Sequence, residues 1–215
     1  MAALTPMMQQ YMEVKNQYKD CILFYRLGDF YEMFFDDALT ASKVLEITLT
    51  GRDCGQPERA PMCGVPYHAC DVYLNKLIEN GFKVAICEQV EDPKLAKGIV
   101  KREVIRVVTP GTNMSNAILD ETRNNYLMSI FENDGAFGIS LVDITTGEFK
   151  TARVPSLSKL TDEINKYSPA EIIGNHSFMN CDLDFVYLRE KMKISISEAP
   201  EDFPTIRKST RYDCI

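Results

Sequence analysis

The chain has 215 residues, 45% hydrophobic and 26% charged, a composition typical of one or two globular domains with a substantial core. It has no run of about 18 apolar residues and no basic and apolar leader, so we expect neither a membrane span nor a secretory signal. The net charge of −7 argues against binding nucleic acid through bulk positive charge. A local basic patch remains, although its pattern favours a solvated loop: Lys94, Lys97, Lys101, Arg102 and Arg106.

The first half of the sequence predicts alternating helices and strands. A helix begins at Thr5, where Pro6 occupies the first turn. Gly28 and Asp29 predict a turn after the first strand, and Gly81 ends a later helix. In chain order we expect a helix over 5–18, a strand over 21–27, a helix over 30–45, a strand over 46–52, a loop over 53–68, a helix over 69–81, and strands over 82–90 and 102–111.

The second half predicts a separate α/β domain after a polar linker over 113–124. Gly135 and Gly147 mark the turns of a three-stranded meander, and Ser156 is the N-cap of the helix that follows it. The expected elements are strands over 126–134, 135–146 and 147–154, a helix over 156–168, a strand over 170–175, a helix over 181–192 and a strand over 193–199. The predicted fold class is therefore α/β with two domains, residues 1–112 and 125–215.

The stretch from Arg26 to Asp37, RLGDFYEMFFDD, has more large apolar side chains than one face of a helix can bury. If a helix starts here, Asp29 and Glu32 match a capping box, in which Glu32 reaches back to the first turn. Phe30 then staples the turn hydrophobically. The pattern by itself favours these structural roles.

The cysteines and histidines offer only weak candidates for a site. The seven cysteines are odd in number and contain no C-x-x-C pair, which favours a reducing, intracellular setting. The best metal candidates match none of the usual zinc spacings, so we expect ordinary thiols and no metal: Cys54, Cys63, His68 and Cys70. The segment PMCGVPYHA predicts a rigid loop in which a structural His68 is favoured over a catalytic one.

Five segments, in this order and at these distances, resemble the N-terminal region of the MutS family of bacterial DNA mismatch-recognition proteins: TPMMQQY, FYRLGDFYEMFFDDA, MCGVPYHA, VAICEQVEDP and VIRVVTPGT. The resemblance is dense over residues 5–112 and weaker over 113–200. It implies a mismatch-recognition domain followed by a connector domain with a fold similar to ribonuclease H. Residues beyond about 200 show no match to the family.

The resemblance also implies site residues. A Phe-x-Glu motif that enters the minor groove at a mispaired or unpaired base maps onto Phe30 and Glu32. Arg52 resembles a position that contacts the DNA backbone, and the remaining DNA-binding candidates near the same surface are Leu27, Tyr67 and His68. Mismatched double-stranded DNA is the implied partner. No residue is implied to be catalytic.

The same resemblance implies a larger assembly. No G-x-x-x-x-G-K-[ST] run occurs in the 215 residues, so we expect no ATP hydrolysis by the chain alone, with ATP and magnesium serving the full-length protein. The family implies a homodimer when full length, a MutL-like partner at the connector domain, and a bacterial cytoplasmic, nucleoid-associated location.

A different class of function is a nuclease. A ribonuclease-H-like domain can bind two metals through clustered carboxylates. The candidates are Asp143, Glu148, Glu171, Asp182 and Asp184, and this interpretation requires three or four of them to converge. The alternative is that Asp143 and Glu148 simply flank a hairpin turn on the solvent side.

Overall fold

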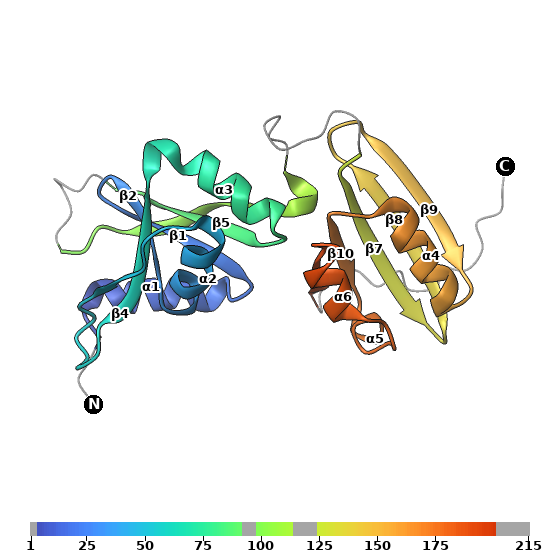
Figure 1. Cartoon of the computed structure of the whole chain (residues 1–215), viewed down its shortest axis with the longest axis horizontal. Helices are drawn as coiled ribbons and strands as arrows, with labels where there is room; N and C mark the ends of the chain where they lie inside the picture. The colour runs from blue at the N-terminus through green and yellow to red at the C-terminus, as the bar shows by residue number, and fades with distance from the viewer. Residues whose placement is uncertain (1–3, 92–97, 114–123, 201–215) are drawn as a thin grey trace.

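The computed structural model describes residues 4–91, 98–113 and 124–200, which form two α/β units lying side by side (Figure 1). Each unit is built on one mixed sheet. The strand order is β3-β4-β2-β1-β5-β6 in the first sheet and β11-β10-β7-β8-β9 in the second. The predicted fold class is confirmed. No helix among the described residues is long and apolar enough to span a membrane.

The first sheet is antiparallel except between β1 and β5. Strand β1 pairs antiparallel with β2 and parallel with β5, so residues about 60 positions apart in sequence become neighbours inside the sheet. Its strands are β1 (Cys21–Leu27), β2 (Phe30–Phe34), β3 (Thr50–Arg52), β4 (Ala60–Pro66), β5 (Lys83–Gln89) and β6 (Arg102–Val108).

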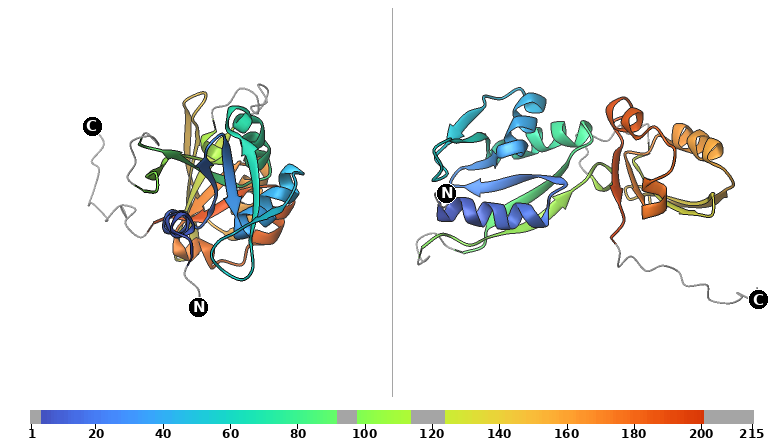
Figure 2. Two further views of the ribbon diagram at one scale, coloured as in Figure 1. Left: turned by 90° about the vertical axis from the view of Figure 1, so that its left-hand side faces the viewer. Right: turned by 90° about the horizontal axis from the view of Figure 1, so that it is seen from below.

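Helices cover both faces of the first sheet. Helices α2 (Phe35–Leu45) and α3 (Cys70–Glu79) bury aliphatic side chains against one face, together with Phe24 and Met33. Helix α1 (Pro6–Gln17) lies along the opposite face, as the right-hand view of Figure 2 shows, and inserts Tyr11 beside Phe34. Successive residues of β1 and β2 point alternately to these two faces, so their aromatic run serves two cores instead of one.

The second unit has its helices on one face of its sheet. The helices α4 (Leu157–Tyr167), α5 (His176–Met179) and α6 (Phe185–Glu190) pack on a core that includes Met128, Ile139 and Ile172. Ser156 caps α4 as predicted, accepting a hydrogen bond from the amide of Lys159. The strands are β7 (Tyr126–Asn133), β8 (Ala136–Asp143), β9 (Glu148–Val154), β10 (Glu171–Gly174) and β11 (Ser195–Glu198).

The predicted helix over 30–45 is wrong in its first five residues. Phe30–Phe34 is strand β2, and α2 begins only at Phe35. The capping box of Asp29 and Glu32 is therefore wrong as well. The reason is tertiary: β2 hydrogen-bonds to β1 on one side and to β4 on the other. A short segment dominated by large apolar side chains is compatible with either structure until its neighbours are known.

Two further expectations need correction in the same sheet. The predicted strand over 46–52 is reduced to β3, and the predicted loop over 53–68 contains strand β4 and then the short 3-10 helix η1 (Tyr67–Ala69). Pro61 and Pro66 suggested a loop, but they stand near the ends of β4, where one missing amide disturbs pairing least. The 3-10 helix η2 (Pro110–Thr112) closes the first unit.

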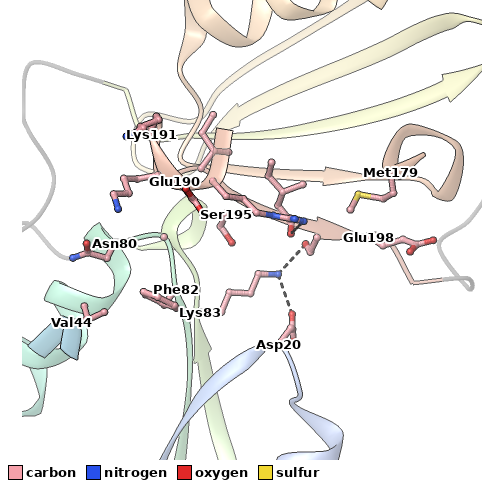
Figure 3. A pocket seen from close by; sticks show the side chains of 16 residues that line it. Asp20, Val44, Asn80, Phe82, Lys83, Met179, Glu190, Lys191, Ser195 and Glu198 are labelled. Atoms are coloured by element: carbon pink, nitrogen blue, oxygen red, sulfur yellow. Dashed lines mark hydrogen bonds and ion pairs between the residues drawn. The ribbon is translucent and has the colours of Figure 1, made fainter. Parts of the chain in front are cut away.

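The two units meet at an open cavity of about 1070 Å³ lined by residues from both sheets (Figure 3). Lys83 extends from β5 into this junction. Its Nζ lies 3.4 Å from Asp20, 3.4 Å from the buried carboxylate of Glu171 and 3.0 Å from the hydroxyl of Ser197. The amide of Gly111 donates to Glu171 at 3.2 Å. The buried carboxylate of the second unit thus holds two groups of the first unit.

Several predicted features lie outside the described residues. These are Lys94 and Lys97 of the basic patch, most of the predicted linker over 113–124, and residues 201–215. The described remainder of the patch is not one surface. Arg102 is buried, donating to the carbonyl of Arg26 at 2.6 Å, and Lys101 pairs with Glu103 at 2.5 Å.

Candidate nucleic-acid interface

The most prominent feature of the first sheet is the tight turn between β1 and β2. Leu27 and Phe30 face each other across the strands, so Gly28 and Asp29 form a two-residue loop. Gly28 has a φ of +57°, a positive value that this hairpin position takes most easily with glycine. The amide of Tyr67 donates to the carbonyl of Asp29 at 3.0 Å, which ties the turn to the end of β4.

Phe30 is the first residue after the turn, and 47% of it is exposed. Its strand neighbours are Leu27 on β1 and Pro66 on β4, so the backbone beneath it is fixed from both sides. Leu27 is partly buried against the core under α1. An exposed aromatic ring on a hydrogen-bonded backbone is well placed to contact a partner.

Glu32 lies on the same face of the sheet as Phe30, because strand residues two apart point the same way. Its carboxylate Oε2 accepts a hydrogen bond from Arg52 Nη1 in an ion pair. The side chain of Glu32 is 15% exposed and that of Arg52 is 37% exposed. The structure therefore brings together three of the predicted residues, Phe30, Glu32 and Arg52.

Tyr67 and His68 lie at the same end of the sheet but contact a different group of residues. The guanidinium of Arg26 stacks over the Tyr67 ring at 3.7 Å, and Arg26 also pairs with Glu88 at 3.6 Å. Arg26 lies on the opposite face of β1 from Leu27. His68 is exposed and meets the Tyr67 ring edge-on. Arg26 was not predicted from the sequence, where its position two residues before Gly28 was the only available signal.

A buried polar cluster under α1 supports the hairpin from below. Asp37 is buried, pairs with Lys15 at 2.8 Å and accepts from the amide of Leu23 at 3.0 Å. Tyr11 donates its hydroxyl to the same carboxylate at 3.3 Å. Burial, reinforced by the charge of Asp37, raises the pKa of Tyr11 far above its ordinary value. This cluster fixes α1 and α2 against β1.

The predicted carboxylates of the second unit do not form a common site. Asp143 is fully buried and accepts from the amide and hydroxyl of Thr145 at 2.9 and 2.6 Å. Burial favours the neutral acid, but these hydrogen bonds outweigh it and lower the pKa of Asp143. Asp143 thus closes its hairpin turn from inside, and the expectation that it lies on the solvent side is wrong.

The other carboxylates have separate partners. Glu148 binds Lys150 at 2.7 Å, Glu171 lies at the junction of the units, and Asp184 caps α6 through the amide of Tyr187. Across residues 4–91, 98–113 and 124–200, no group of three or more His, Cys, Asp or Glu side chains could hold a metal ion. The convergence that a two-metal nuclease requires is not found in this part of the chain.

Comparison with known families matches both units. Residues 5–117 match the model of MutS domain I, and residues 125–202 match that of MutS domain II. A protein named DNA mismatch repair protein MutS from Lachnoclostridium phytofermentans is 67% identical over 197 residues, covering 92% of this chain and 21% of that protein. Proteins of the same name from Acetivibrio thermocellus and Ruminiclostridium cellulolyticum are 59% and 64% identical over 94% and 82% of the chain.

The chain spans between a fifth and a quarter of the length of these curated relatives. The two matched domains nevertheless cover nearly all of its own length, and they coincide with the two sheets. The chain therefore belongs to the MutS family, of which it carries domains I and II.

Proposed function

We propose that this chain is the DNA-reading and connecting part of a longer mismatch repair protein, and that it detects a mispaired or unpaired base by inserting Phe30 into the minor groove. The observation that carries the proposal is the half-exposed Phe30 ring at a hairpin turn whose backbone is hydrogen-bonded on both sides. The names of the relatives support a role in mismatch repair.

The chemistry of an inserted ring suits this task. A wedged aromatic side chain unstacks one base step and kinks the duplex. Unstacking costs a few kcal/mol in paired DNA and less where pairing is already broken. Phe30 would therefore measure how weakly a base pair is held and would not need to identify the bases. One residue can serve many different mismatches in this way.

Glu32 supplies the discrimination against normal duplex. A carboxylate near phosphates is repelled, and this weakens binding to paired DNA. At a mismatch, Glu32 would reach a base edge and share a hydrogen bond that offsets the repulsion. The position of Glu32 on the Phe30 face of β2 is compatible with both contacts.

The same proposal includes the partners of the longer protein. We assign ATP and magnesium to regions beyond this chain, a homodimer to the full-length protein, and a MutL-like partner to the second unit. The proposed DNA-binding surface is completed by Arg52, Leu27, Tyr67 and His68. Contacts between such a surface and the DNA backbone orient a protein without reading the base sequence.

The test is a binding titration with the full-length protein that contains this chain. Wild type and Phe30→Ala are each titrated on a G·T-mismatched duplex and on its paired counterpart at one stated salt concentration. We expect wild type to prefer the mismatch and Phe30→Ala to bind both duplexes weakly and equally. The loss of preference follows because alanine has no ring to stack on the exposed base.

Phe149→Ala is the matched control, because Phe149 is 65% exposed on β9 of the other unit. It should leave the preference intact. Circular dichroism and urea unfolding check that Phe30→Ala keeps its fold. If Phe30→Ala still discriminates as well as wild type, or if it loses its fold, Phe30 only packs against the turn and the proposal is wrong.

A further inference from the structure

We infer that Arg52 is a positioning residue for Glu32, which holds and screens the carboxylate until a mispaired base draws it away. This inference rests on the proposed function, and it assigns to Arg52 a role other than simple attachment to phosphate. The observation behind it is the ion pair between Arg52 Nη1 and Glu32 Oε2.

The ion pair crosses a strand. Arg52 ends β3 at the sheet edge, Glu32 is in β2, and β4 lies between them. The partner of Glu32 on β4 is Gly64. A Cβ at position 64 would lie 3.4 Å from the Glu32 Cγ, so a larger side chain would lie against the carboxylate arm. Glycine leaves the path from Glu32 to Arg52 open.

The pair sets up a competition when DNA approaches. Glu32 cannot contact a base edge while its carboxylate lies against Arg52, and a released Arg52 is free to bind a phosphate. On a paired duplex no base edge is available, so the carboxylate stays screened by the guanidinium. On a mismatched duplex the base contact replaces the ion pair. The guanidinium therefore lowers, but does not abolish, the repulsion between the Glu32 carboxylate and the phosphates until a base edge is available.

This arrangement predicts a specific non-additivity. In the wild-type background, Arg52→Ala removes the screen and leaves a bare carboxylate beside the phosphates. In the Glu32→Gln background, the same substitution removes only a phosphate contact. We expect the loss of affinity for paired DNA to be roughly fivefold larger in the first background than in the second. The difference should shrink as salt is raised.

The experiment measures dissociation constants of the full-length protein for paired and mismatched duplexes in four forms: wild type, Arg52→Ala, Glu32→Gln and the double variant. Arg52→Lys, which keeps the charge, should restore most of the affinity. Arg59→Ala is the matched control, since Arg59 is exposed in the same β3–β4 segment. It should cause the same loss in both backgrounds.

A double-mutant cycle on the melting temperatures of the same four forms, measured without DNA, tests the ion pair itself. We expect the effects of the two substitutions on the melting temperature to be non-additive. Two results would overturn the inference. One is a loss of affinity for paired DNA from Arg52→Ala that is no larger in the wild-type background than in the Glu32→Gln background. The other is additivity of the two effects on the melting temperature. Either result leaves the Phe30 test untouched, because that test compares mismatch preference and not coupling between two side chains.

Discussion

The spacing of Phe30 and Glu32 has a simple meaning at the scale of single residues. In a strand, residues i and i+2 share a face, whereas in a helix they point about 200° apart. Because β2 is a strand, the aromatic ring and the carboxylate lie side by side on the surface of the sheet. Tyr31 and Met33 point the other way into the core. The surface pair is thus held by its buried neighbours.

Glu32→Ala tests the proposed repulsion. Without the carboxylate, Arg52 is free to bind phosphate, so we expect paired DNA to bind roughly fivefold more tightly, a change of about 1 kcal/mol. The mismatch preference should fall accordingly. Titrations at one salt concentration measure both quantities. Glu163→Ala, on the surface of α4, is the control and should change neither.

Unchanged or weaker binding of Glu32→Ala to paired DNA would contradict the repulsion argument. That result would leave Glu32 a structural role as the partner of Arg52. The two possibilities also differ in stability. A purely structural Glu32 predicts a lower melting temperature for Glu32→Ala with no gain in affinity for either duplex.

At the scale of elements, local patterns predicted β1, β5, β6, the meander of β7 to β9, and α4 with its Ser156 cap. Each of these depends on residues close in sequence. Strands β2 and β4 were missed because each requires the other as a hydrogen-bonded neighbour about 30 residues away. The Phe30 and Glu32 assignment came from family resemblance, and the residue pattern alone favoured a cap. Nothing local indicates that Arg52 reaches Glu32 across β4.

The core of the first sheet should be sensitive to alkali. Burial raises the pKa of Cys21 and Cys87 to about 12 and that of Cys63 to about 11. The pKa of a thiol in the unfolded chain is about 8.5. The folded state therefore holds these protons more tightly. The contribution of these thiols to folding stability is complete at pH values below the pKa of an unfolded thiol. It is lost as the pH rises toward the pKa values of the folded state.

We expect urea unfolding to give a lower free energy at about pH 10 than at about pH 8, by about 1–2 kcal/mol for each such thiol. Cys87→Ala should reduce this pH dependence, whatever it does to stability at neutral pH. Cys181→Ala, in the second unit, should reduce it less, because that thiol is only partly buried. A free energy that is the same at both pH values would contradict the prediction.

At the scale of the whole molecule, the two units are joined by more than the chain between them. The buried carboxylate of Glu171 binds Lys83 of β5 and the amide of Gly111 in η2. A Cβ at Gly111 would lie 2.9 Å from the Glu171 side chain, so the backbone packs closely here. Glu171 therefore helps to fix the orientation of the second sheet, together with the hydrogen bond from Lys83 to Ser197.

Glu171→Ala should loosen this junction. The Gly111 amide loses its acceptor, so we expect its hydrogen exchange to accelerate by about tenfold or more, as the loss of a hydrogen bond to a charged group implies. Nuclear magnetic resonance measures this exchange directly. Glu148→Ala, which breaks the exposed pair with Lys150 in the same unit, is the control. Undiminished protection of Gly111 in Glu171→Ala would show that another contact holds the junction.

The parallel pairing of β1 with β5 has a consequence for the order in which the chain folds. Strands β1 and β2 need only a two-residue turn and can pair as soon as both have been synthesised. The other edge of β1 stays open until Lys83–Gln89 has left the ribosome. During that interval the apolar run from Cys21 to Tyr25 presents an unpaired edge, the kind of surface on which nascent chains aggregate. Strand β1, which ends at the Gly28–Asp29 turn, thus stays open along one edge while about 60 further residues are synthesised.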